Sequence, residues 1–280
     1  MKPFYSGKVR DLYELNGDLM MVATDRISAY DVILQSELPK KGIILNKLSR
    51  FHFKKYNYVL KKHGIKCPIV VDAEIPIEFE NRAIVMKKCK PLPIEAIVRG
   101  YLFGSAVVEY NESSTICGIT IPKGLQIASQ LDKPLFTPST KAAIGDHDIN
   151  ISFDKMISIC GKEIATKIRD FSLDLFQIAS KDILECGIIL CDTKLEFGLL
   201  NDELYLIDEV LTPDSSRYWS KDHYKVGISP PSFDKQFIRD YLTMNNLKGQ
   251  PAILPQDIID KTLAKYIECY EKVTASKFDF

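Results

Sequence analysis

Residues 192–219 read DTKLEFGLLNDELYLIDEVLTPDSSRYW, and this stretch decides the fold that we predict. Two runs rich in strand-forming residues, 188–200 and 203–210, flank the polar pair Asn201-Asp202. A polar pair between two such runs is typical of the turn of a β-hairpin. The sequence therefore predicts two antiparallel strands joined by a tight turn.

One face of this hairpin should carry charged side chains. Because side chains alternate along a strand, Asp192, Lys194 and Glu196 share a face. A three-residue loop, 201–203, would place Asp208 directly opposite Glu196, whereas a two-residue loop would shift that register by one. Opposed carboxylates destabilise a sheet unless a cation lies between them, and hard oxygen ligands suit Mg²⁺. We expect a Mg²⁺ site here, with a solvated acidic face as the alternative.

The turn that follows the hairpin, PDSSR at 213–217, adds a carboxylate, hydroxyl groups and a guanidinium. Asp214 and Arg217 thus lie close in sequence to the acidic strands. Mixed charge packed this tightly beside apolar strands is more typical of a binding site than of a plain surface.

The 280-residue chain has the composition of a globular protein, with 46% hydrophobic and 26% charged residues. Its 37 basic and 37 acidic residues cancel, so bulk charge predicts no nucleic-acid or membrane partner. The seven scattered cysteines include no CxxC pair, which favours reduced thiols. No apolar signal segment opens the sequence, and we expect a cytoplasmic protein.

Two N-terminal segments combine charge with strand-like flanks. In SGKVRD, residues 6–11, backbone amides could approach phosphates, with Lys8 and Arg10 supplying charge. The segment matches neither the Walker pattern nor GxGxxG, so a solvated basic turn is the alternative. The charged segment TDRISAYD, residues 24–31, lies between apolar strands and is either functional or a set of turn caps.

Pro91 and Pro93 break the chain, which predicts a β-rich unit at 1–90 and a second unit at 91–280. Soon afterwards Arg99 ends an apolar strand, a costly place for a charge unless an anion or an acid meets it. The sequence leaves an anion site, assisted by a helix starting near Ser105, and a structural salt bridge equally open.

The periodicity of apolar residues predicts several helices. One is capped by Asn46 and runs to about residue 60, and the longest spans 162–186. The longest helix should pack beneath the hairpin, in a βαβ-like order that sets the acidic strand beside the Arg99 strand. Two C-terminal helices, within 233–274, carry no catalytic signature. Their apolar faces suit the core or a subunit contact, so a homodimer is possible.

A polar segment, TPSTKAAIGDHD at 137–148, precedes the longest helix. Long polar loops in compact domains tend to be functional or disordered. His147, between two aspartates, is either a general base or, as we favour, a residue that stabilises the turn.

Eight segments in chain order resemble the phosphoribosylaminoimidazole-succinocarboxamide synthase (SAICAR synthetase) family of purine biosynthesis. They are SGKVRDLYE, TDRISAYDV, KGIILNKLS, EAIVRGYLFGSA, TPSTKAAIGDHD, DTKLEFG, LIDEVLTPDSSRYW and PSFDKQFIRDYL, between residues 6 and 242. The resemblance implies an α+β fold with a kinase-like antiparallel β N-terminal lobe, an α/β lobe with C-terminal helices, and an ATP-binding cleft between them.

The resemblance also implies the reaction. ATP, the carboxylated aminoimidazole ribonucleotide (CAIR) and L-aspartate would give the succinocarboxamide (SAICAR), ADP and phosphate through an acyl phosphate. Mg²⁺ would be the cofactor and ATP a co-substrate.

The resemblance also implies roles for individual residues. Lys194 and Asp192 would be catalytic, and Glu196 and Asp208 would hold Mg²⁺. ATP would contact Gly7, Lys8, Val9, Arg10, Met86 and Lys87, and CAIR would contact Arg99, Ser105, Asp214 and Arg217. Ser28, Asp31, Ser139, Thr140 and Lys141 would close over L-aspartate. Some members of the family carry a lysine where Arg10 stands, which leaves the individual role of Arg10 open.

Two other classes of protein compete with the ligase. An ATP-dependent small-molecule kinase would use the same acidic hairpin but should need an HRDxxxxN run, which the sequence lacks. A non-catalytic nucleotide-binding module should have lost a metal-binding acid or a phosphate-binding cation, and none is lost.

Overall fold

The computed structural model describes residues 1–30, 32–141 and 148–279. Asp31 and His147, for which the sequence suggested roles, lie outside the described residues. Within the described ranges, no helix combines the length and apolar character needed to cross a membrane.

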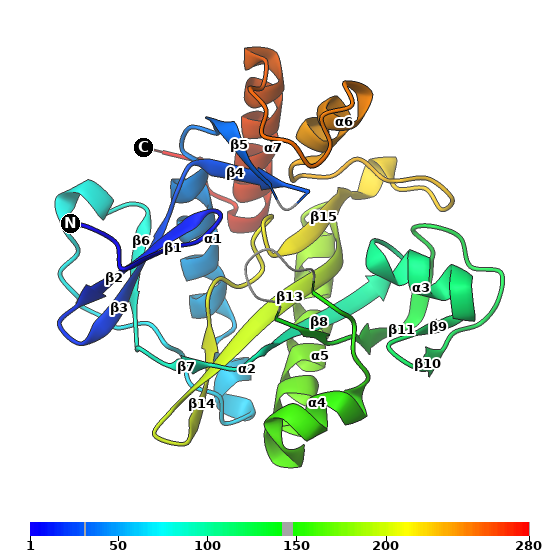
Figure 1. Ribbon diagram of the computed structural model, residues 1–280, viewed down its shortest axis with the longest axis horizontal. Coiled ribbons are helices and arrows are strands. Elements are labelled where there is room, and N and C mark those ends of the chain that lie inside the picture. Colours follow the sequence, from blue (N-terminus) through cyan, green and yellow to red (C-terminus); the bar gives the residue numbers. More distant parts are fainter. Residues whose placement is uncertain (31, 142–147, 280) are drawn as a thin grey trace.

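An antiparallel sheet in the order β1-β2-β3-β6 forms the N-terminal part of the fold, on the left of Figure 1. Its strands are β1 (Tyr5–Ser6), β2 (Arg10–Leu15), β3 (Asp18–Ala23) and β6 (Ala83–Met86). Between β3 and β6, a separate two-stranded sheet joins β4 (Arg26–Ala29) to β5 (Val32–Glu37). Both sheets are therefore built from short antiparallel strands.

A larger antiparallel sheet occupies the centre of the molecule, in the order β11-β8-β13-β14. The short strands β7 and β15 also pair with β13, and β12 pairs with β8. The strands are β7 (Lys90–Pro91), β8 (Ile94–Tyr101), β11 (Gln130–Phe136), β12 (Ser139–Thr140), β13 (Ile188–Leu200), β14 (Glu203–Ile207) and β15 (Ser216–Ser220). The mixed fold with antiparallel sheets confirms the predicted α+β class.

The predicted hairpin is β13 and β14, and of the two registers that the sequence left open it has the one with a two-residue loop. Glu196 pairs with Ile207, not with Asp208, because the loop contains only Asn201 and Asp202. Both loop residues have positive φ angles, 50° and 61°, the backbone of a type I′ turn. Asp208 follows the end of β14 with a φ of 62°, so the chain turns away from the ladder there.

The longest helix lies beneath the hairpin, as the sequence predicted. α5 (Lys162–Glu185) packs across β8, β11 and β13 and follows the short helix α4 (Phe153–Cys160). β13 does lie beside β8, the strand of Arg99, but the two run antiparallel. The βαβ-like order was therefore wrong, since β11 and β12 return the chain along β8 before α5 begins.

The predicted capping role of Asn46 is also wrong. The helix begins earlier, as α1 (Lys41–Lys55), and continues as α2 (Asn57–Lys62). Oδ1 of Asp25, distant in sequence, accepts a hydrogen bond from the first-turn amide of Gly42 at 2.9 Å. A side chain at Gly42 would overlap the Ala23 carbonyl oxygen, so a glycine is needed for α1 to meet β3 this closely.

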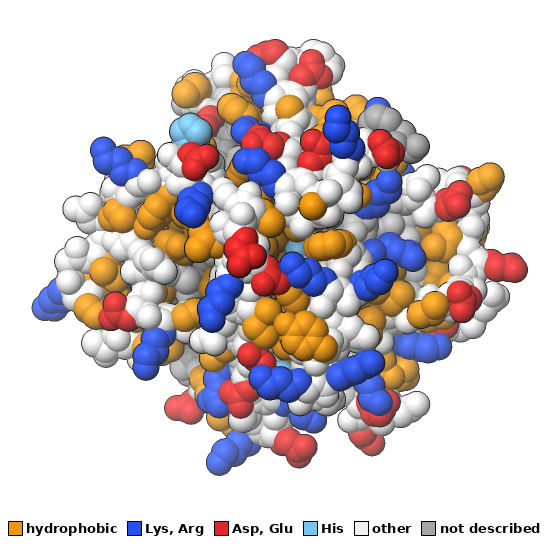
Figure 2. Space-filling view, turned by 180° about the vertical axis from the view of Figure 1, so that it is seen from behind, with side chains coloured by type: hydrophobic (Ala, Val, Ile, Leu, Met, Phe, Trp, Pro, Cys, Tyr) orange, Lys and Arg blue, Asp and Glu red, His pale blue; other side chains and the backbone are white. Residues whose placement is uncertain are grey.

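The remaining elements surround these sheets. They are the 3₁₀ turns η1 (Ile77–Phe79) and η2 (Lys221–His223), the helices α3 (Ser105–Ser113), α6 (Gln236–Met244) and α7 (Gln256–Thr274), and the strands β9 (Thr115–Ile116) and β10 (Ile119–Thr120). In Figure 1, α3, β9 and β10 project on one side, while α6 and α7 stand above the central sheet. α7 packs against both α1 and α6, which joins the end of the chain to its first helix. On the opposite face of the molecule, acidic and basic side chains are interspersed, as the zero net charge suggests (Figure 2).

One core residue gives the fold a pH dependence. His52 of α1 is 1% exposed, and neither ring nitrogen has a hydrogen-bond partner within the described residues. Burial, with Lys55 nearby and against the attraction of Asp182, lowers the pKa of His52 from 6.5 to about 3. The folded protein therefore keeps this ring neutral where the unfolded chain would protonate it.

We expect His52→Phe to reduce the acid sensitivity of folding. The stabilisation that depends on a neutral His52 is fully present above pH 6.5 and is lost as the pH falls from 6.5 toward 3. Relative to the variant, the wild type should lose about 1.4 kcal/mol of unfolding free energy per pH unit in that window. Urea unfolding at several pH values measures this difference, and parallel curves for the two proteins would contradict it.

Candidate active site

A cavity of about 310 Å³ opens over the charged face of β8 and β13. Its walls come from these two strands, from the turn after the hairpin and from the start of α6. Among the predicted site residues, the lining includes Arg99, Ser105, Ser139, Asp192, Lys194, Asp214 and Arg217. The structure therefore brings the predicted CAIR residues and the predicted catalytic residues to one place.

Asp192 joins two arginines in the wall of this cavity. It pairs with Arg99 across the strands, and Nη1 of Arg99 lies 3.1 Å from Asp192 Oδ2. Arg217 of β15 donates to the same carboxylate oxygen. Arg99 also donates to the hydroxyl groups of Thr137, at 3.1 Å, and Ser105, at 3.0 Å. Two guanidinium groups against one carboxylate leave a net positive charge, which suits an anionic ligand.

The guanidinium of Arg217 has little freedom to move. Besides binding Asp192, it lies over the ring of Phe103, 5.4 Å from its centroid, in a cation–π contact. Gly104, with a φ of 63°, borders it on a further side. A Cβ at Gly104 would lie 2.9–3.1 Å from three atoms of the guanidinium. Arg217 thus occupies space that exists only because residue 104 is a glycine.

Lys194 lies farther along the same face of β13, between two carboxylates. Its Nζ lies 2.8 Å from Glu95 Oε1 and 2.6 Å from Glu196 Oε1. Burial alone would lower the pKa of Lys194, but Glu196 and Glu95 together hold it above its ordinary value. Lys141 also binds Glu196, and although burial opposes them, the two lysines keep the Glu196 pKa low. Lys194 and Glu196 are therefore charged at neutral pH.

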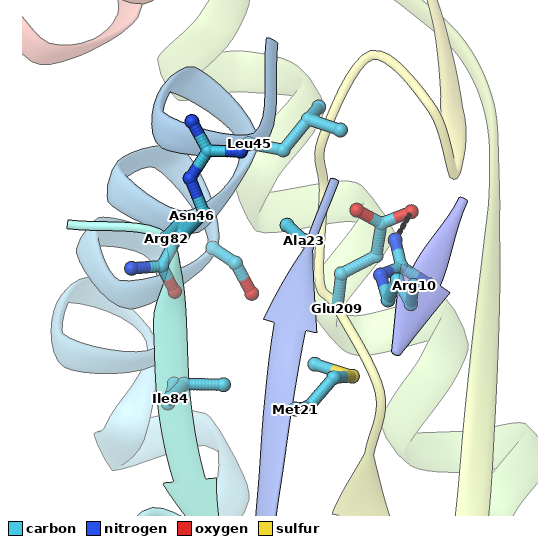
Figure 3. A pocket seen from close by; sticks show the side chains of 9 residues that line it. Arg10, Met21, Ala23, Leu45, Asn46, Arg82, Ile84 and Glu209 are labelled. Atoms are coloured by element: carbon cyan, nitrogen blue, oxygen red, sulfur yellow. Dashed lines mark ion pairs between the residues drawn. The ribbon is translucent and has the colours of Figure 1, made fainter. Parts of the chain in front are cut away.

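A second cluster lies where β2 faces the chain after β14. Nη1 of Arg10 donates to Asp208 at 2.6 Å, and Nη2 pairs with Glu209. Figure 3 shows Arg10 turned toward Glu209, with Asn46 of α1 on the opposite wall of a space of about 10 Å³. Arg10 therefore ties the N-terminal sheet to the end of the acidic hairpin.

The two carboxylates proposed for Mg²⁺ are of the type that this ion prefers, but basic side chains already bind them: Lys141 and Lys194 bind Glu196, and Arg10 binds Asp208. Burial raises the pKa of Asp208 and, although Arg10 opposes this, repulsion from Glu196 adds to it, so the two acids are close enough to interact. Within the described residues, no three acidic, histidine or cysteine side chains are grouped to hold a metal. Mg²⁺ in nucleotide enzymes is commonly held by one or two carboxylates plus substrate phosphates, and Glu196 and Asp208 match that pattern.

Asp214 lines the cavity but is already bound by protein groups. The Tyr266 hydroxyl of α7 donates to Oδ1 at 2.7 Å, and Lys235 lies 3.3 Å from the same oxygen. The fully buried Lys41 of α1 lies 3.1 Å from Oδ2. Burial would raise the pKa of Asp214, but the two lysines hold it far below its usual range.

The predicted nucleotide residues lie outside the cavity. Gly7, Lys8 and Val9 form the turn between β1 and β2, next to the Arg10 cluster, with the Gly7 amide donating to the Arg10 carbonyl at 2.7 Å. Met86 ends β6 and is buried, and the Lys87 amide donates to the Pro68 carbonyl at 2.8 Å.

The structure divides the residues predicted to close over L-aspartate. Ser139 lines the cavity and Lys141 binds Glu196, whereas Thr140, between them on β12, bonds with Ile149. Ser28 lies on β4, opposite Ile33 of β5, and is not part of the cavity wall.

Sequence reasoning missed part of the cavity wall. Glu95 lies four residues before Arg99 on β8, so the two-residue alternation used for β13 would have found it. Asp234, Lys235 and Arg239 also line the cavity, although no catalytic pattern marked that region. The available sequence signal was a pair of basic residues four positions apart, Lys235 and Arg239. Nη2 of Arg239 binds both oxygens of Asp234, at 2.7 and 2.6 Å.

Comparison with known proteins shows which family this chain belongs to. The family model for SAICAR synthetase matches residues 3–254. The phosphoribosylaminoimidazole-succinocarboxamide synthase of Mannheimia succiniciproducens is 49% identical over 280 residues, 98% of each chain. The yeast SAICAR synthase complexed with SAICAR is 42% identical and superposes with a TM-score of 0.90, covering 100% of this chain and 96% of the yeast chain.

A third relative is informative about nucleotides. A SAICAR synthetase in complex with ADP is 26% identical, with a TM-score of 0.73 and 99% of both chains covered. The likeness thus extends from sequence to the whole fold and holds across nearly the full length of each protein. The chain belongs to the SAICAR synthetase family.

Proposed function

We propose that the cavity over β8 and β13 is where this chain, as a ligase of purine biosynthesis, condenses CAIR with L-aspartate. The family's reaction consumes ATP and gives SAICAR, ADP and phosphate. The observation that carries the proposal is that Asp192, Lys194 and Glu196 follow one another along a single face of β13. Together with Arg99 and Arg217, it sets an anion-binding end beside a lysine–carboxylate end within one cavity.

We assign the arginine end to the phosphate of CAIR. Arg99 and Arg217 present fork-shaped donors, which match phosphate oxygens, and the Ser105 hydroxyl lies beside them. Asp192 was predicted to be catalytic, but its contacts with both arginines support a positioning role. Asp214 keeps its proposed place near a hydroxyl or amine of CAIR, held there by Lys41 and Lys235.

Lys194 would then lie beside the carboxylate of CAIR. A carboxylate oxygen attacks the γ-phosphorus of ATP, the bond to the bridging oxygen breaks, and ADP leaves. Because the high pKa of Lys194 keeps it protonated, it can neutralise the carboxylate as phosphate approaches. A Mg²⁺ held by Glu196 and Asp208 would neutralise charge on the ATP phosphates.

The second step forms the amide. The amine of L-aspartate attacks the acyl carbon, phosphate departs and the nitrogen loses a proton. Ser139 and Lys141 border the Lys194 end of the site and are the described residues best placed to meet L-aspartate. Ser28 and Thr140 receive less support, because their described contacts lie elsewhere.

We place ATP along the turn of Gly7, Lys8, Val9 and Arg10, with adenine near Met86 and Lys87. In this arrangement the phosphates approach Asp208 from the side of Arg10. A nucleotide-binding N-terminal lobe at 1–90 and a substrate lobe at 91–280, as the sequence predicted, would meet along this line. Cytoplasmic location, the absence of a nucleic-acid partner and a homodimer stay predictions of the sequence.

The reaction is tested by measuring ADP release from ATP, Mg²⁺ and CAIR, with and without L-aspartate. We expect ADP only when L-aspartate is present, and a product heavier than CAIR by one dehydrated aspartate in the mass spectrum. ADP release without L-aspartate, with a lasting phosphorylated CAIR, would instead identify a kinase.

Asp208→Asn tests the metal assignment. The substitution keeps the shape of the side chain but removes its charge, so kcat should fall by about two to three orders of magnitude at every Mg²⁺ concentration. The melting temperature should change little. Asp202→Asn is the matched control, because Asp202 belongs to the same hairpin but lies exposed in the turn. A kcat for Asp208→Asn equal to that of the control would remove Asp208 from the metal site.

Gly104→Ala tests whether the position of the Arg217 guanidinium matters for binding CAIR. The added Cβ would displace the guanidinium, so the KM for CAIR should rise at least about tenfold while the KM for ATP stays within about twofold. Gly124→Ala is the control, because Gly124 also has a positive φ but has nothing within 4 Å of the added atom. Both variants should also lose stability from backbone strain, on the order of 1–3 kcal/mol. Equal KM values for CAIR in the two variants would show that strain alone is responsible.

A further inference from the structure

Arg26, in the segment TDRISAYD, binds the backbone of the turn before β2. Its Nη2 donates to the Gly7 carbonyl at 3.1 Å, and its Nε donates to the Lys8 carbonyl at 3.3 Å. The same guanidinium binds both carboxylate oxygens of Asp11, at 2.8 and 3.0 Å. One side chain therefore holds the first residues of the turn and the strand that follows it.

The neighbouring Thr24 completes this set of contacts. The Val9 carbonyl accepts from the Thr24 amide at 3.0 Å and from its hydroxyl at 2.8 Å. Three consecutive carbonyl oxygens, of Gly7, Lys8 and Val9, are thus bound by residues 24 and 26. They all face the side of the turn on which β4 begins.

The orientation of the carbonyls fixes the orientation of the amides. In a trans peptide, the C=O of one residue points opposite to the N–H of the next. Because the Gly7 and Lys8 carbonyls face Arg26, the amides of Lys8 and Val9 point to the opposite side of the turn. Successive amides that point the same way form a concave site for an anion such as phosphate.

We propose that Arg26 is a positioning residue that turns the amides of Lys8 and Val9 toward the phosphates of the nucleotide. The proposal rests on the proposed function, in which this turn binds ATP.

Two features favour positioning over a general structural role. The Arg26 side chain is 26% exposed, so it lies at the edge of the sheet and not in the core. Burial would raise the pKa of Asp11, but hydrogen bonds from Arg26 and Ser6 lower it, so Asp11 is a charged anchor at neutral pH. Asp11 therefore fixes the guanidinium while its Nε and Nη2 donate to the carbonyls of the turn.

Arg26→Lys tests the proposal, because lysine keeps the charge but cannot reproduce the fork of donors. The Kd for ADP with Mg²⁺, measured by calorimetry on the full chain, should rise about tenfold. The Kd for CAIR should stay within about twofold. Arg82→Lys is the matched control, since Arg82 is 29% exposed and pairs with Asp25 without touching the turn. Its Kd for ADP should match the wild type.

Two outcomes would overturn the proposal. One is an unchanged Kd for ADP in Arg26→Lys, which would show that the turn keeps its shape without the fork. The other is an equal weakening of ADP and CAIR, which would show a general effect on the fold.

Lys8→Ala separates this proposal from the proposed function. If Lys8→Ala and Arg26→Lys both bind ADP as the wild type does, the turn is not the phosphate site, and the nucleotide assignment falls together with the role of Arg26. If Lys8→Ala weakens ADP and Arg26→Lys does not, only the positioning role of Arg26 is lost.

Discussion

Asp192 pairs with Arg99 across the antiparallel strands β13 and β8, and this register decides which side chains meet over the central sheet. Because strand side chains alternate, the pairing also brings Lys194 and Glu196 to the face of Glu95. A slip of one residue in β13 would turn its charged set to the other face of the sheet, against α5. The chemistry of the cavity therefore depends on the same hydrogen-bonded ladder that forms the core.

The register places charges where water is scarce, so each charge needs a partner. Isolated buried charges are strongly unfavourable, and even paired ones recover only part of the cost of leaving water. The site meets this constraint by alternating signs: Asp192 serves two arginines, and Lys194 lies between two carboxylates. A substrate that brings its own charges enters a network whose groups are already oriented, which limits the reorganisation that binding requires.

Local patterns in the sequence predicted the parts of the site that local geometry determines. Alternation along β13 placed Asp192, Lys194 and Glu196 together, and an apolar repeat gave the length of α5 within a residue. The sequence left the hairpin loop at two or three residues, and the positive φ angles that Asn201 and Asp202 tolerate decide for two. The start of α1 was missed because its first-turn amide is bound by Asp25, a contact formed only by tertiary packing.

The contacts around Asp214 show why no short motif could have revealed the complete site. Its carboxylate meets Lys41 from α1, Lys235 beside α6 and Tyr266 from α7. These residues are separated by as much as 225 positions, yet they converge on one wall of the cavity. Elements from both ends of the chain must therefore pack before that wall exists. A site built in this way constrains the whole sequence, which agrees with a similarity to the Mannheimia relative that extends over 98% of the chain.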